Sequence, residues 1–364
     1  MLYTARQEAI LRAVRRNGSV RVTEMAAQLK VSPMSVRRDI TALTEAGILD
    51  RVHGGAVLAR SEPAARPVGV LRPERGRPLS LGMVVPSHSP YFEELIQGAR
   101  TGARSLGAQL RIGFSSYDGG EDDALVRRLL DDHLDGLLLT PSRSLQETQP
   151  MLDRLGALGV PLVIVERRQE ATAAIDGFDY VSSHHEHGAL QALRHLSGTG
   201  HRRIGLLSRA SATSHWISRA FDLATDHFGL PTDVPRVING HPYEEGEAAR
   251  QVVDFLDEVA ASGVTAVVAH PDVQAVMLLH EARARRWSVP GDLAIVAYDD
   301  ETAALADVPL TAVAPPREAV GRIAVARLVR RIREGRAHVA QHILVPPHLN
   351  IRESTRGWGP LPQE

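Results

Sequence analysis

The sequence predicts an α/β protein with two modules, a small helical head closed by a short hairpin and a larger two-lobed body built on parallel sheets. Three observations predict this. From residue 80 onward, short apolar runs alternate with amphipathic stretches. Residues 61–79 contain four prolines and two glycines, a composition typical of an extended spacer. The charge also divides at residue 79, because 14 basic residues face 7 acidic ones before it and 28 face 36 after it.

The head is predicted to span residues 1–60 and to begin with three helices. Thr4 is a suitable N-cap for the first, whose apolar stripe ends at Asn17-Gly18, a helix stop signal. A second, short helix is expected after Thr23. Ser32 then caps a third helix, with Pro33 at its first position.

The third helix should bury one face and expose the other. Val36, Ile40 and Leu43 recur at helical spacing and form the predicted buried face. The outward positions are then Met34, Ser35, Arg37, Arg38 and Thr41. Two short strands, 48–51 and 56–58, are expected around His53-Gly54-Gly55.

The body is predicted to span residues 80–354, followed by a tail over 355–364. Its expected strands are 81–85, 110–114, 136–139, 162–165, 204–207, 264–269 and 293–297. The helices between them include 91–106, 121–132, 188–197, 245–260, 273–285 and 317–334. This length exceeds one typical core, so two α/β lobes are expected, with a ligand held in the cleft at the carboxyl ends of their strands.

Composition excludes several classes of protein. The chain has no cysteine, which excludes disulfides, a thiol nucleophile, thiolate-bound zinc and iron–sulfur clusters. The N-terminus lacks the apolar region of a signal peptide. No apolar run approaches the ~20 residues needed to cross a bilayer. We therefore expect a cytoplasmic protein without a membrane partner.

The head has the order of a helix-turn-helix, in which the exposed first turns of the second helix of the motif meet base edges in the major groove. Arg pairs with guanine and Ser with either base edge, which makes Ser35, Arg37 and Arg38 candidates for reading bases. The Ser32 hydroxyl would hold a phosphate. The alternative interpretation of Arg37-Arg38-Asp39 is a salt-bridged helix surface without function.

The ordered string of motifs in the head closely resembles the deoxyribose-regulator (DeoR) type of winged helix-turn-helix. The segments are Arg6-Gln-Glu-Ala-Ile-Leu, Val22-Thr-Glu-Met-Ala-Ala-Gln-Leu-Lys-Val-Ser, Ser35-Val-Arg-Arg-Asp-Ile-Thr-Ala-Leu and Gly47-Ile-Leu-Asp-Arg-Val-His-Gly-Gly-Ala-Val-Leu. The resemblance implies that the wing carries Arg51 and His53. The DNA-binding candidates are Ser32, Met34, Ser35, Arg37, Arg38, Arg51 and His53.

The body resembles the effector domain of the lactose/galactose-repressor family, which has the fold of periplasmic sugar-binding proteins. The segments are Leu81-Gly-Met-Val-Val-Pro, Ser89-Pro-Tyr-Phe-Glu-Glu-Leu, Asp135-Gly-Leu-Leu-Leu, Pro161-Leu-Val-Ile-Val, Gly200-His-Arg-Arg-Ile-Gly-Leu-Leu, Val289-Pro-Gly-Asp-Leu-Ala-Ile-Val-Ala-Tyr-Asp-Asp, Pro309-Leu-Thr-Ala-Val and Arg352-Glu-Ser. The resemblance implies a regulator, expected to be a repressor, that binds double-stranded operator DNA as a homodimer or larger homo-oligomer and needs no cofactor.

The ligand positions that the resemblance implies are only partly kept. Tyr91-Phe92 and Asp299-Asp300 match, but His184 replaces an expected aspartate, Ile217 an arginine and Pro271 an asparagine. The ligand-binding candidates are Tyr91, Phe92, His184, Trp216, Arg219, Asp272 and Asp300. Unpaired groups cost ~1–3 kcal/mol each, so we expect an atypical effector, such as a modified sugar. Alternatively, Arg219 and the histidines replace the lost contacts, or the alignment slips in this loop.

Competing functions have weaker support in the sequence. His184 and His187 have the spacing of metal ligands on one helix, but no third ligand is evident, so no metal is expected. Gly198-Thr199-Gly200 precedes a strand and lacks a third glycine, unlike a dinucleotide-binding loop. A sugar-modifying or nucleotide-dependent enzyme is the rival class, although the sequence has no Walker loop or nucleophile elbow. We therefore expect a protein that is not an enzyme.

Overall fold

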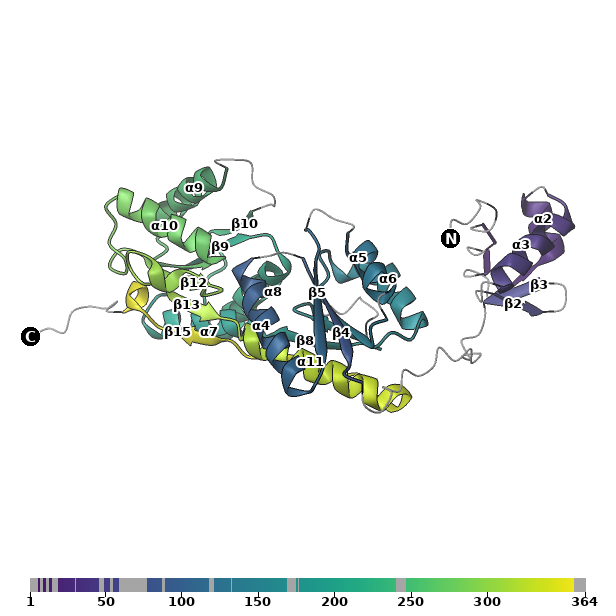
Figure 1. Cartoon of the computed structure of the whole chain (residues 1–364). Coiled ribbons are helices and arrows are strands. Elements are labelled where there is room, and N and C mark those ends of the chain that lie inside the picture. The colour runs from purple at the N-terminus through teal and green to yellow at the C-terminus, as the bar shows by residue number, and fades with distance from the viewer. Residues whose placement is uncertain are drawn as a thin grey trace, which may run out of the picture. The chain divides into compact units, whose positions relative to one another are not determined.

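The computed structural model describes residues 6, 9–10, 13–14, 19–29, 31–45, 49–52, 55–58, 77–86, 89–117, 121–131, 133–168, 175, 177–239 and 247–356 (Figure 1). The chain divides into two compact units, Met1–Val70 and Leu71–Glu364. Of the expected spacer over 61–79, only residues 77–79 are described, and of the expected tail only residues 355 and 356. None of the described helices is both long enough and apolar enough to cross a membrane.

The first unit is a small helical domain on a three-stranded antiparallel sheet. Its helices are α2 (Val22–Leu29) and α3 (Pro33–Glu45), preceded by helical residues at 6, 9, 10, 13 and 14. The strands β1 (Ser19–Arg21), β3 (Gly55–Leu58) and β2 (Leu49–Val52) lie in that order. The sequence predicted β2 and β3 as a hairpin, and their antiparallel pairing confirms it.

The predicted third helix is confirmed in detail as α3. The Ser32 hydroxyl accepts a hydrogen bond from the Ser35 backbone N–H at 3.1 Å, so Ser32 caps the helix and Pro33 is its first residue. Val36, Ile40 and Leu43 are all at most 1% exposed and pack in the head's apolar core. The opposite face of α3 is therefore left to solvent.

The expected start of the second helix after Thr23 is wrong. The helix α2 begins at Val22 and contains Thr23 in its first turn. The reason is β1, a strand that the sequence pattern does not predict, which pairs with β3 from Ser19 to Arg21. The chain passes from this strand directly into the helix and leaves no room for a separate capping residue.

The second unit contains two six-stranded sheets, and we call the parts around them the N-lobe and the C-lobe. The N-lobe sheet has the order β14-β8-β7-β6-β4-β5, and all its strands are parallel. Its strands are β4 (Ser80–Val85), β5 (Gln109–Phe114), β6 (Gly136–Leu139), β7 (Leu162–Val165), β8 (Asp179–Ser183) and β14 (His342–Val345). Its helices are α4 (Pro90–Ser105), α5 (Glu121–Asp131), α6 (Leu145–Ala157) and α11 (Arg317–Glu334).

The C-lobe sheet has the order β10-β9-β11-β12-β13-β15, in which only β15 is antiparallel to its neighbour. Its strands are β9 (Ile204–Arg209), β10 (Arg236–Asn239), β11 (Ala266–His270), β12 (Ala294–Tyr298), β13 (Thr311–Ala314) and β15 (His348–Asn350). Its helices are α7 (His185–Gly198), α8 (Ala212–Phe228), α9 (Glu247–Ser262) and α10 (Asp272–Ala284). The short 3₁₀ helices are η1 (Ala303–Leu305), η2 (Gly335–Ala337) and η3 (Glu353–Thr355).

The two-lobed parallel α/β body confirms the predicted fold class. All seven predicted strands and all six predicted helices are present, with ends shifted by at most a few residues. Buried apolar runs explain this success, since β4, β6, β7, β11 and β12 are buried along their whole length. The sequence pattern did not predict α6, α8, β8, β10, β13, β14 and β15.

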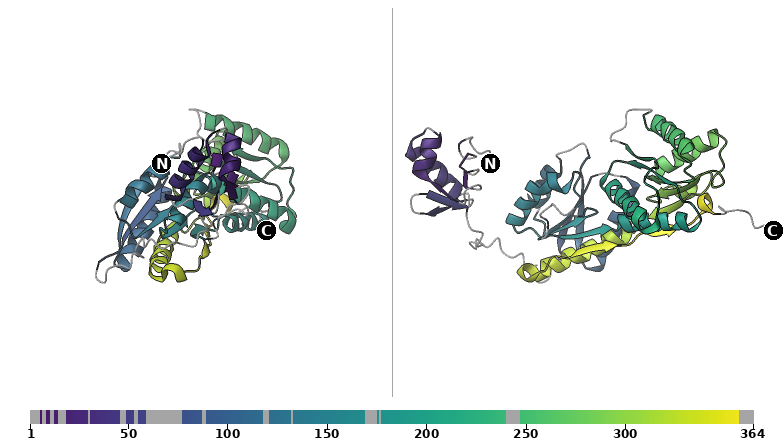
Figure 2. Two further views of the ribbon diagram at one scale, coloured as in Figure 1. Left: turned by 90° about the vertical axis from the view of Figure 1, so that its right-hand side faces the viewer. Right: turned by 180° about the vertical axis from the view of Figure 1, so that it is seen from behind.

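The chain passes between the lobes three times in the second unit. It runs from β8 to α7, returns from β13 to α11, and crosses again between β14 and β15. Neither lobe is therefore a continuous piece of sequence. Figures 1 and 2 show α11, in yellow-green, extending along the N-lobe after the second crossing.

The helices α4 and α11 approach each other so closely that glycine is required at their contact. A Cβ added to Gly98 would lie 2.0 Å from the Glu318 carbonyl oxygen. A Cβ added to Gly321 would lie 2.0 Å from the Leu95 carbonyl oxygen. Both obstacles are backbone atoms, which cannot rotate away as a side chain does.

Replacing Gly321→Ala should therefore destabilise the second unit by about 1–3 kcal/mol, because α11 must move away from α4. Thermal or urea unfolding of the full chain measures the change. The matched control is Gly198→Ala near the end of α7, where an added Cβ meets no atom within 4 Å. Equal stability of the two variants would contradict the close contact.

Candidate DNA-binding surface and interlobe site

The outer face of α3 presents two arginines to solvent. Arg37 and Arg38 are exposed, and neither makes an ion pair within the described part of the chain. Met34 is 65% exposed, and Ser35 is partly buried beside Ser32, with the two hydroxyl oxygens 3.0 Å apart. The first two turns of the helix thus combine hydroxyl groups with two available guanidinium groups.

Asp39 points away from these arginines and into the domain. It is 5% exposed and pairs with Arg6, whose Nη2 donates to Asp39 Oδ1 at 3.2 Å. The salt-bridged surface considered for Arg37-Arg38-Asp39 therefore does not describe α3. Because Arg6 neutralises the one acid in this stretch, Arg37 and Arg38 keep their full charge toward the outside.

The two candidate residues in the wing, Arg51 and His53, lie largely outside the described residues. Arg51 lies in β2, but its side chain is outside the described residues, as is the whole of His53. Their assignment to the wing remains a prediction from the resemblance.

A second group of polar residues collects where the strands of both lobes end, and we call it the interlobe site. On the N-lobe side, Glu166 follows β7 with a positive φ of 52° and is 4% exposed. Its carboxylate accepts hydrogen bonds from the Ser183 backbone N–H at 3.0 Å and from the Ser183 hydroxyl at 2.8 Å. His185 Nε2 lies 3.6 Å from Glu166 Oε2.

Glu166 is held in its charged form despite burial. Burial by itself would raise the pKa of the Glu166 carboxyl. The hydrogen bond and charge of His185, together with the bonds from Ser183, outweigh burial and lower that pKa. The N-lobe side of the site therefore holds an ionised carboxylate whose two oxygens are already bonded to Ser183.

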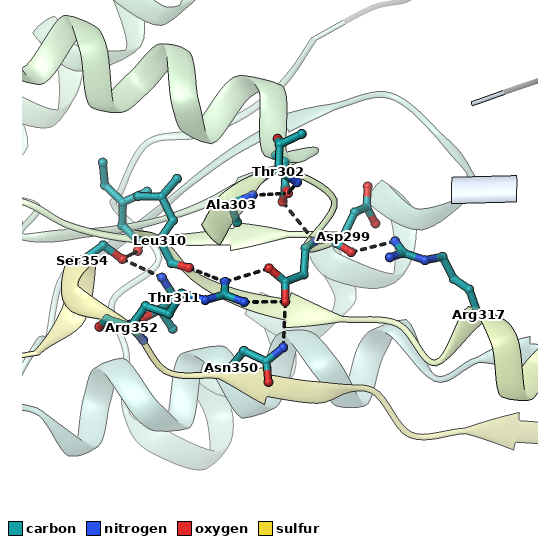
Figure 3. Close-up of polar contacts among 12 residues, drawn as sticks. Asp299, Thr302, Ala303, Leu310, Thr311, Arg317, Asn350, Arg352 and Ser354 are labelled. Atoms are coloured by element: carbon teal, nitrogen blue, oxygen red, sulfur yellow. Dashed lines mark hydrogen bonds and ion pairs between the residues drawn. The ribbon is translucent and has the colours of Figure 1, made fainter. Parts of the chain in front are cut away.

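On the C-lobe side, a single carboxylate shapes the loop after β12. Asp272 accepts hydrogen bonds from the backbone N–H groups of Asp300, Thr302 and Ala303, at 3.1, 2.7 and 2.9 Å (Figure 3). These bonds hold the loop in an unusual backbone conformation, with φ of 103° at Asp299 and 55° at Asp300. The acceptor capacity of Asp272 is thus used inside the protein.

The two aspartates of this loop have different environments. Asp300 accepts hydrogen bonds from both terminal nitrogens of Arg352, at 2.7 and 2.8 Å, and from the Asn350 amide at 2.7 Å (Figure 3). Asp299 is 7% exposed, and its Oδ1 has no hydrogen-bond partner among the described residues. Burial, with the nearby charges of Asp272 and Glu301, raises the pKa of Asp299 well above its usual range. Of the two aspartates, Asp299 is therefore the one whose carboxyl group keeps an unpaired oxygen.

Arg317 joins the two lobes at this point. It begins α11, and its Nη1 donates to the Asp299 carbonyl oxygen at 2.7 Å (Figure 3). Its Nε donates to Glu94 of α4 at 2.9 Å, and its Cζ lies 5.2 Å from the centre of the Tyr91 ring. Burial and the charges of Glu166 and Asp299 raise the pKa of Tyr91, which keeps the phenol neutral.

A further contact between the lobes involves Arg168 and Trp216. Arg168 follows β7 of the N-lobe, and its Cζ lies 3.2 Å from the centre of the Trp216 ring on α8. Glu186 of α7 accepts from Arg168 Nη2 at 3.3 Å and also lies 3.1 Å from Arg219 Nε. His184 caps α7, with its Nδ1 accepting from the His187 backbone N–H at 3.2 Å.

The predicted ligand residues are brought together only in part. Tyr91, His184, Trp216 and Arg219 lie in the contacts described above. Phe92 is 4% exposed and packs in the N-lobe core, while Asp272 and Asp300 have internal partners. Within the described residues, no group of three or more His, Cys, Asp or Glu side chains could hold a metal ion.

Several site residues were not identified from the sequence, namely Glu166, Arg168, Ser183, Arg317 and His270, whose Nε2 lies 3.7 Å from Asp299 Oδ2. A usable signal existed for most of them. Glu166, Ser183 and His270 end or follow a buried strand, at the edge where parallel sheets bind ligands. Arg317 stands at the first position of a predicted helix.

Comparison with protein families divides the chain as the geometry does. A DeoR-like helix-turn-helix domain matches residues 6–62, and a periplasmic binding protein-like domain matches residues 193–355. HTH-type transcriptional regulator CelR of Thermobifida fusca is 31% identical over 73% of this chain and 76% of its own length. The arabinose metabolism transcriptional repressor of Geobacillus stearothermophilus is 26% identical over 92% of this chain and 90% of its own length.

A solved structure supports the same relationship. The complex of transcriptional regulator CelR with cellobiose aligns with 89% of this chain and 91% of its own, at 25% identity and a TM-score of 0.66. The predicted combination of a DeoR-type head with a LacI-type effector body is confirmed.

The buried His270 makes a prediction about pH. Burial, with His185 and Arg209 nearby, lowers the pKa of His270 to about 3. In the unfolded chain a histidine gains its proton near pH ~6.5. Between these values the unfolded state binds one more proton, so stability falls as the pH falls, by at most about 1.4 kcal/mol per pH unit.

His270→Gln should reduce this loss of stability at low pH, because glutamine binds no proton. Urea unfolding at a series of pH values from about 7.5 to about 5 measures the slope. The raised pKa of Asp299 gives a slope of the opposite sign. Because His270 Nε2 lies 3.7 Å from Asp299 Oδ2, His270→Gln is also compared in an Asp299→Asn background, in which the contribution of Asp299 is absent. His348→Gln, at an exposed position, is the control, and an equal slope in both variants would contradict the assignment.

Proposed function

Because the chain belongs to the family of LacI-type transcriptional regulators that includes CelR, we propose that it is a repressor whose binding to operator DNA is controlled by a small effector in the interlobe site. The head binds the DNA, and the two-lobed body binds the effector. Cellobiose in the CelR structure supports a sugar-like effector here.

The observation that carries the DNA-binding proposal is the exposed pair Arg37 and Arg38. Both arginines stand on a serine-capped helix, and their only acidic neighbour within α3's first two turns pairs with Arg6 instead. Such a helix enters the major groove with its first turns against base edges. We assign base or phosphate contacts to Ser32, Met34, Ser35, Arg37 and Arg38, and wing contacts to Arg51 and His53.

The interlobe site suits a polyhydroxylated compound. Tyr91 on the N-lobe side offers a hydroxyl group, and Asp299 on the C-lobe side offers an unpaired carboxyl oxygen. Glu166 and Ser183, which bond each other, and His270, which pairs with Ser208, surround these two groups. Ile217 is fully buried in the C-lobe core and therefore does not stand at a ligand position. The replacements at His184 and Pro271 still favour an atypical effector over a plain hexose. Asp299 takes the role first given to Asp300, because Asp300 already accepts from Arg352.

Effector control follows from the contacts that join the lobes. A ligand that bonds Asp299 on one side and Tyr91 on the other changes the balance between lobe arrangements, since it binds one arrangement better. The regulator then acts as a homodimer, because one short recognition helix reads few bases and a two-fold operator supplies the rest. We infer that it works in the cytoplasm and by binding alone, without catalysis.

Arg37→Ala and Arg38→Ala should each weaken operator binding, and the salt dependence will separate their roles. Replacing an arginine that contacts a base should cost about 1–3 kcal/mol of binding free energy and relax specificity at one base position of the operator. Replacing an arginine that contacts a phosphate should weaken binding to all DNA sequences alike and reduce the slope of log affinity against log salt concentration by about 1. Electrophoretic mobility shifts at several salt concentrations, on a site found by genomic footprinting, measure both.

The matched control is Arg128→Gln, which removes the same charge from an exposed position on α5. This variant should bind the operator as the unmodified chain does. Deleting residues 1–60 should abolish sequence-specific binding. Unchanged binding in both α3 variants would refute the assignment of this surface.

A further inference from the structure

We propose that the effector carries an anionic group, a carboxylate or a phosphate ester, which is bound by Arg168 together with Arg219 at the N-terminal end of α7. This inference rests on the proposed function and names the chemical class of the ligand. It concerns the cluster of Arg168, Trp216, Glu186 and Arg219, which we call the arginine cluster.

Arg168 is a buried cation with unused hydrogen-bonding capacity. Its side chain is 10% exposed and lies flat enough on Trp216 to bring Cζ within 3.2 Å of the ring centre. Its Nε is buried and has no hydrogen-bond partner among the described residues. A guanidinium group normally uses its rigid set of donors when it is taken out of water, so the orphaned Nε indicates a missing acceptor.

Among the residues that the structure describes, the charges in the cluster do not balance. Two guanidinium groups, those of Arg168 and Arg219, share the one described carboxylate, that of Glu186, at 3.3 and 3.1 Å. Burial lowers the pKa of Arg168, and the interaction with Glu186, which acts in the opposite direction, does not offset it. One further negative charge would neutralise the cluster.

The surrounding groups favour an anion as well. The cluster adjoins the first turn of α7, where the helix dipole is positive. Burial and the charges of Arg168 and His187 lower the pKa of His184, so its imidazole stays neutral. This ring accepts a hydrogen bond from the His187 backbone N–H and brings no negative charge to the cluster. Tyr180 also lies near enough to interact with Arg168 and contributes a neutral phenol.

The position of the cluster connects it to effector sensing. Arg168 belongs to the loop after β7, two residues from Glu166, whereas Trp216 and Arg219 stand on α8 of the C-lobe. An anion held by both arginines would therefore touch both lobes. Carboxylate and phosphate oxygens match the fork of donors on arginine, which hydroxyl groups do not.

The test measures binding to the full chain by calorimetry, with thermal unfolding as a second readout. The probes are D-gluconate, D-glucuronate, D-glucose 6-phosphate and inorganic phosphate, and D-glucose is the neutral counterpart. We expect at least one anionic probe to bind and D-glucose to bind at least about tenfold more weakly. The sugar acids and the phosphates distinguish a carboxylate from a phosphate group.

Arg168→Gln should weaken the anionic probe by about 10- to 100-fold, because it removes the buried charge. Arg219→Gln should cause a smaller loss, and its half-exposed side chain makes misfolding a poor explanation. Arg128→Gln on α5 removes an equal charge elsewhere and should leave binding unchanged.

The proposal is overturned if D-glucose binds as tightly as the anions. It is also overturned if no anion affects the unmodified chain, or if Arg168→Gln and Arg128→Gln respond alike. Operator binding without ligand, measured on the same proteins, reports on the proposed function separately. A regulator that binds DNA normally but ignores anions would contradict only the arginine cluster.

Discussion

The interlobe site depends on one carboxylate that does not itself face a ligand. Asp272 begins α10 and binds three backbone N–H groups of the loop after β12. Those bonds offset the strain of two consecutive residues with positive φ. The consequence is that the two neighbouring aspartates have different environments. The Asp300 carboxylate accepts hydrogen bonds from Arg352, whereas the Asp299 carboxyl group keeps an unpaired oxygen. Without the hydrogen bonds of the Asp272 carboxylate, the backbone that orients the Asp299 and Asp300 side chains would not be fixed.

The same loop is tied to the opposite lobe through its backbone. Arg317 holds the Asp299 carbonyl while also bonding Glu94 and facing Tyr91. Arg168 makes the second bridge through Trp216 and Glu186. Both bridges use arginine, whose fixed fork can contact several groups at once. A change in the relative position of the lobes must therefore break or rebuild these contacts, which is how local binding acquires a wider effect.

Periodicity and capping residues in the sequence predicted most of the fold but less of the site. Val36, Ile40 and Leu43 defined the face of α3, and fully apolar runs defined the central strands, because burial imposes a pattern on neighbouring residues. Short or partly exposed strands such as β10 and β14 carry no such pattern. The site was harder, because choosing Asp299 over Asp300 requires knowing where Arg352 lies, 52 positions away. Likewise, no residue close to Arg168 in the sequence predicts its contact with Trp216.

The three passages of the chain between the lobes set an order for folding during synthesis. The N-lobe sheet has its edge strand β14 at residues 342–345, and its helix α11 at residues 317–334, after nearly all of the C-lobe. On the ribosome, β8 can pair with β7 on one side, but its other edge stays unpaired until about 160 further residues have been made. The head needs no later segment for its own sheet and can fold first. Nascent chains would thus display a complete DNA-binding head before any lobe is finished, and the exposed edge of β8 is the place where chaperones would be needed.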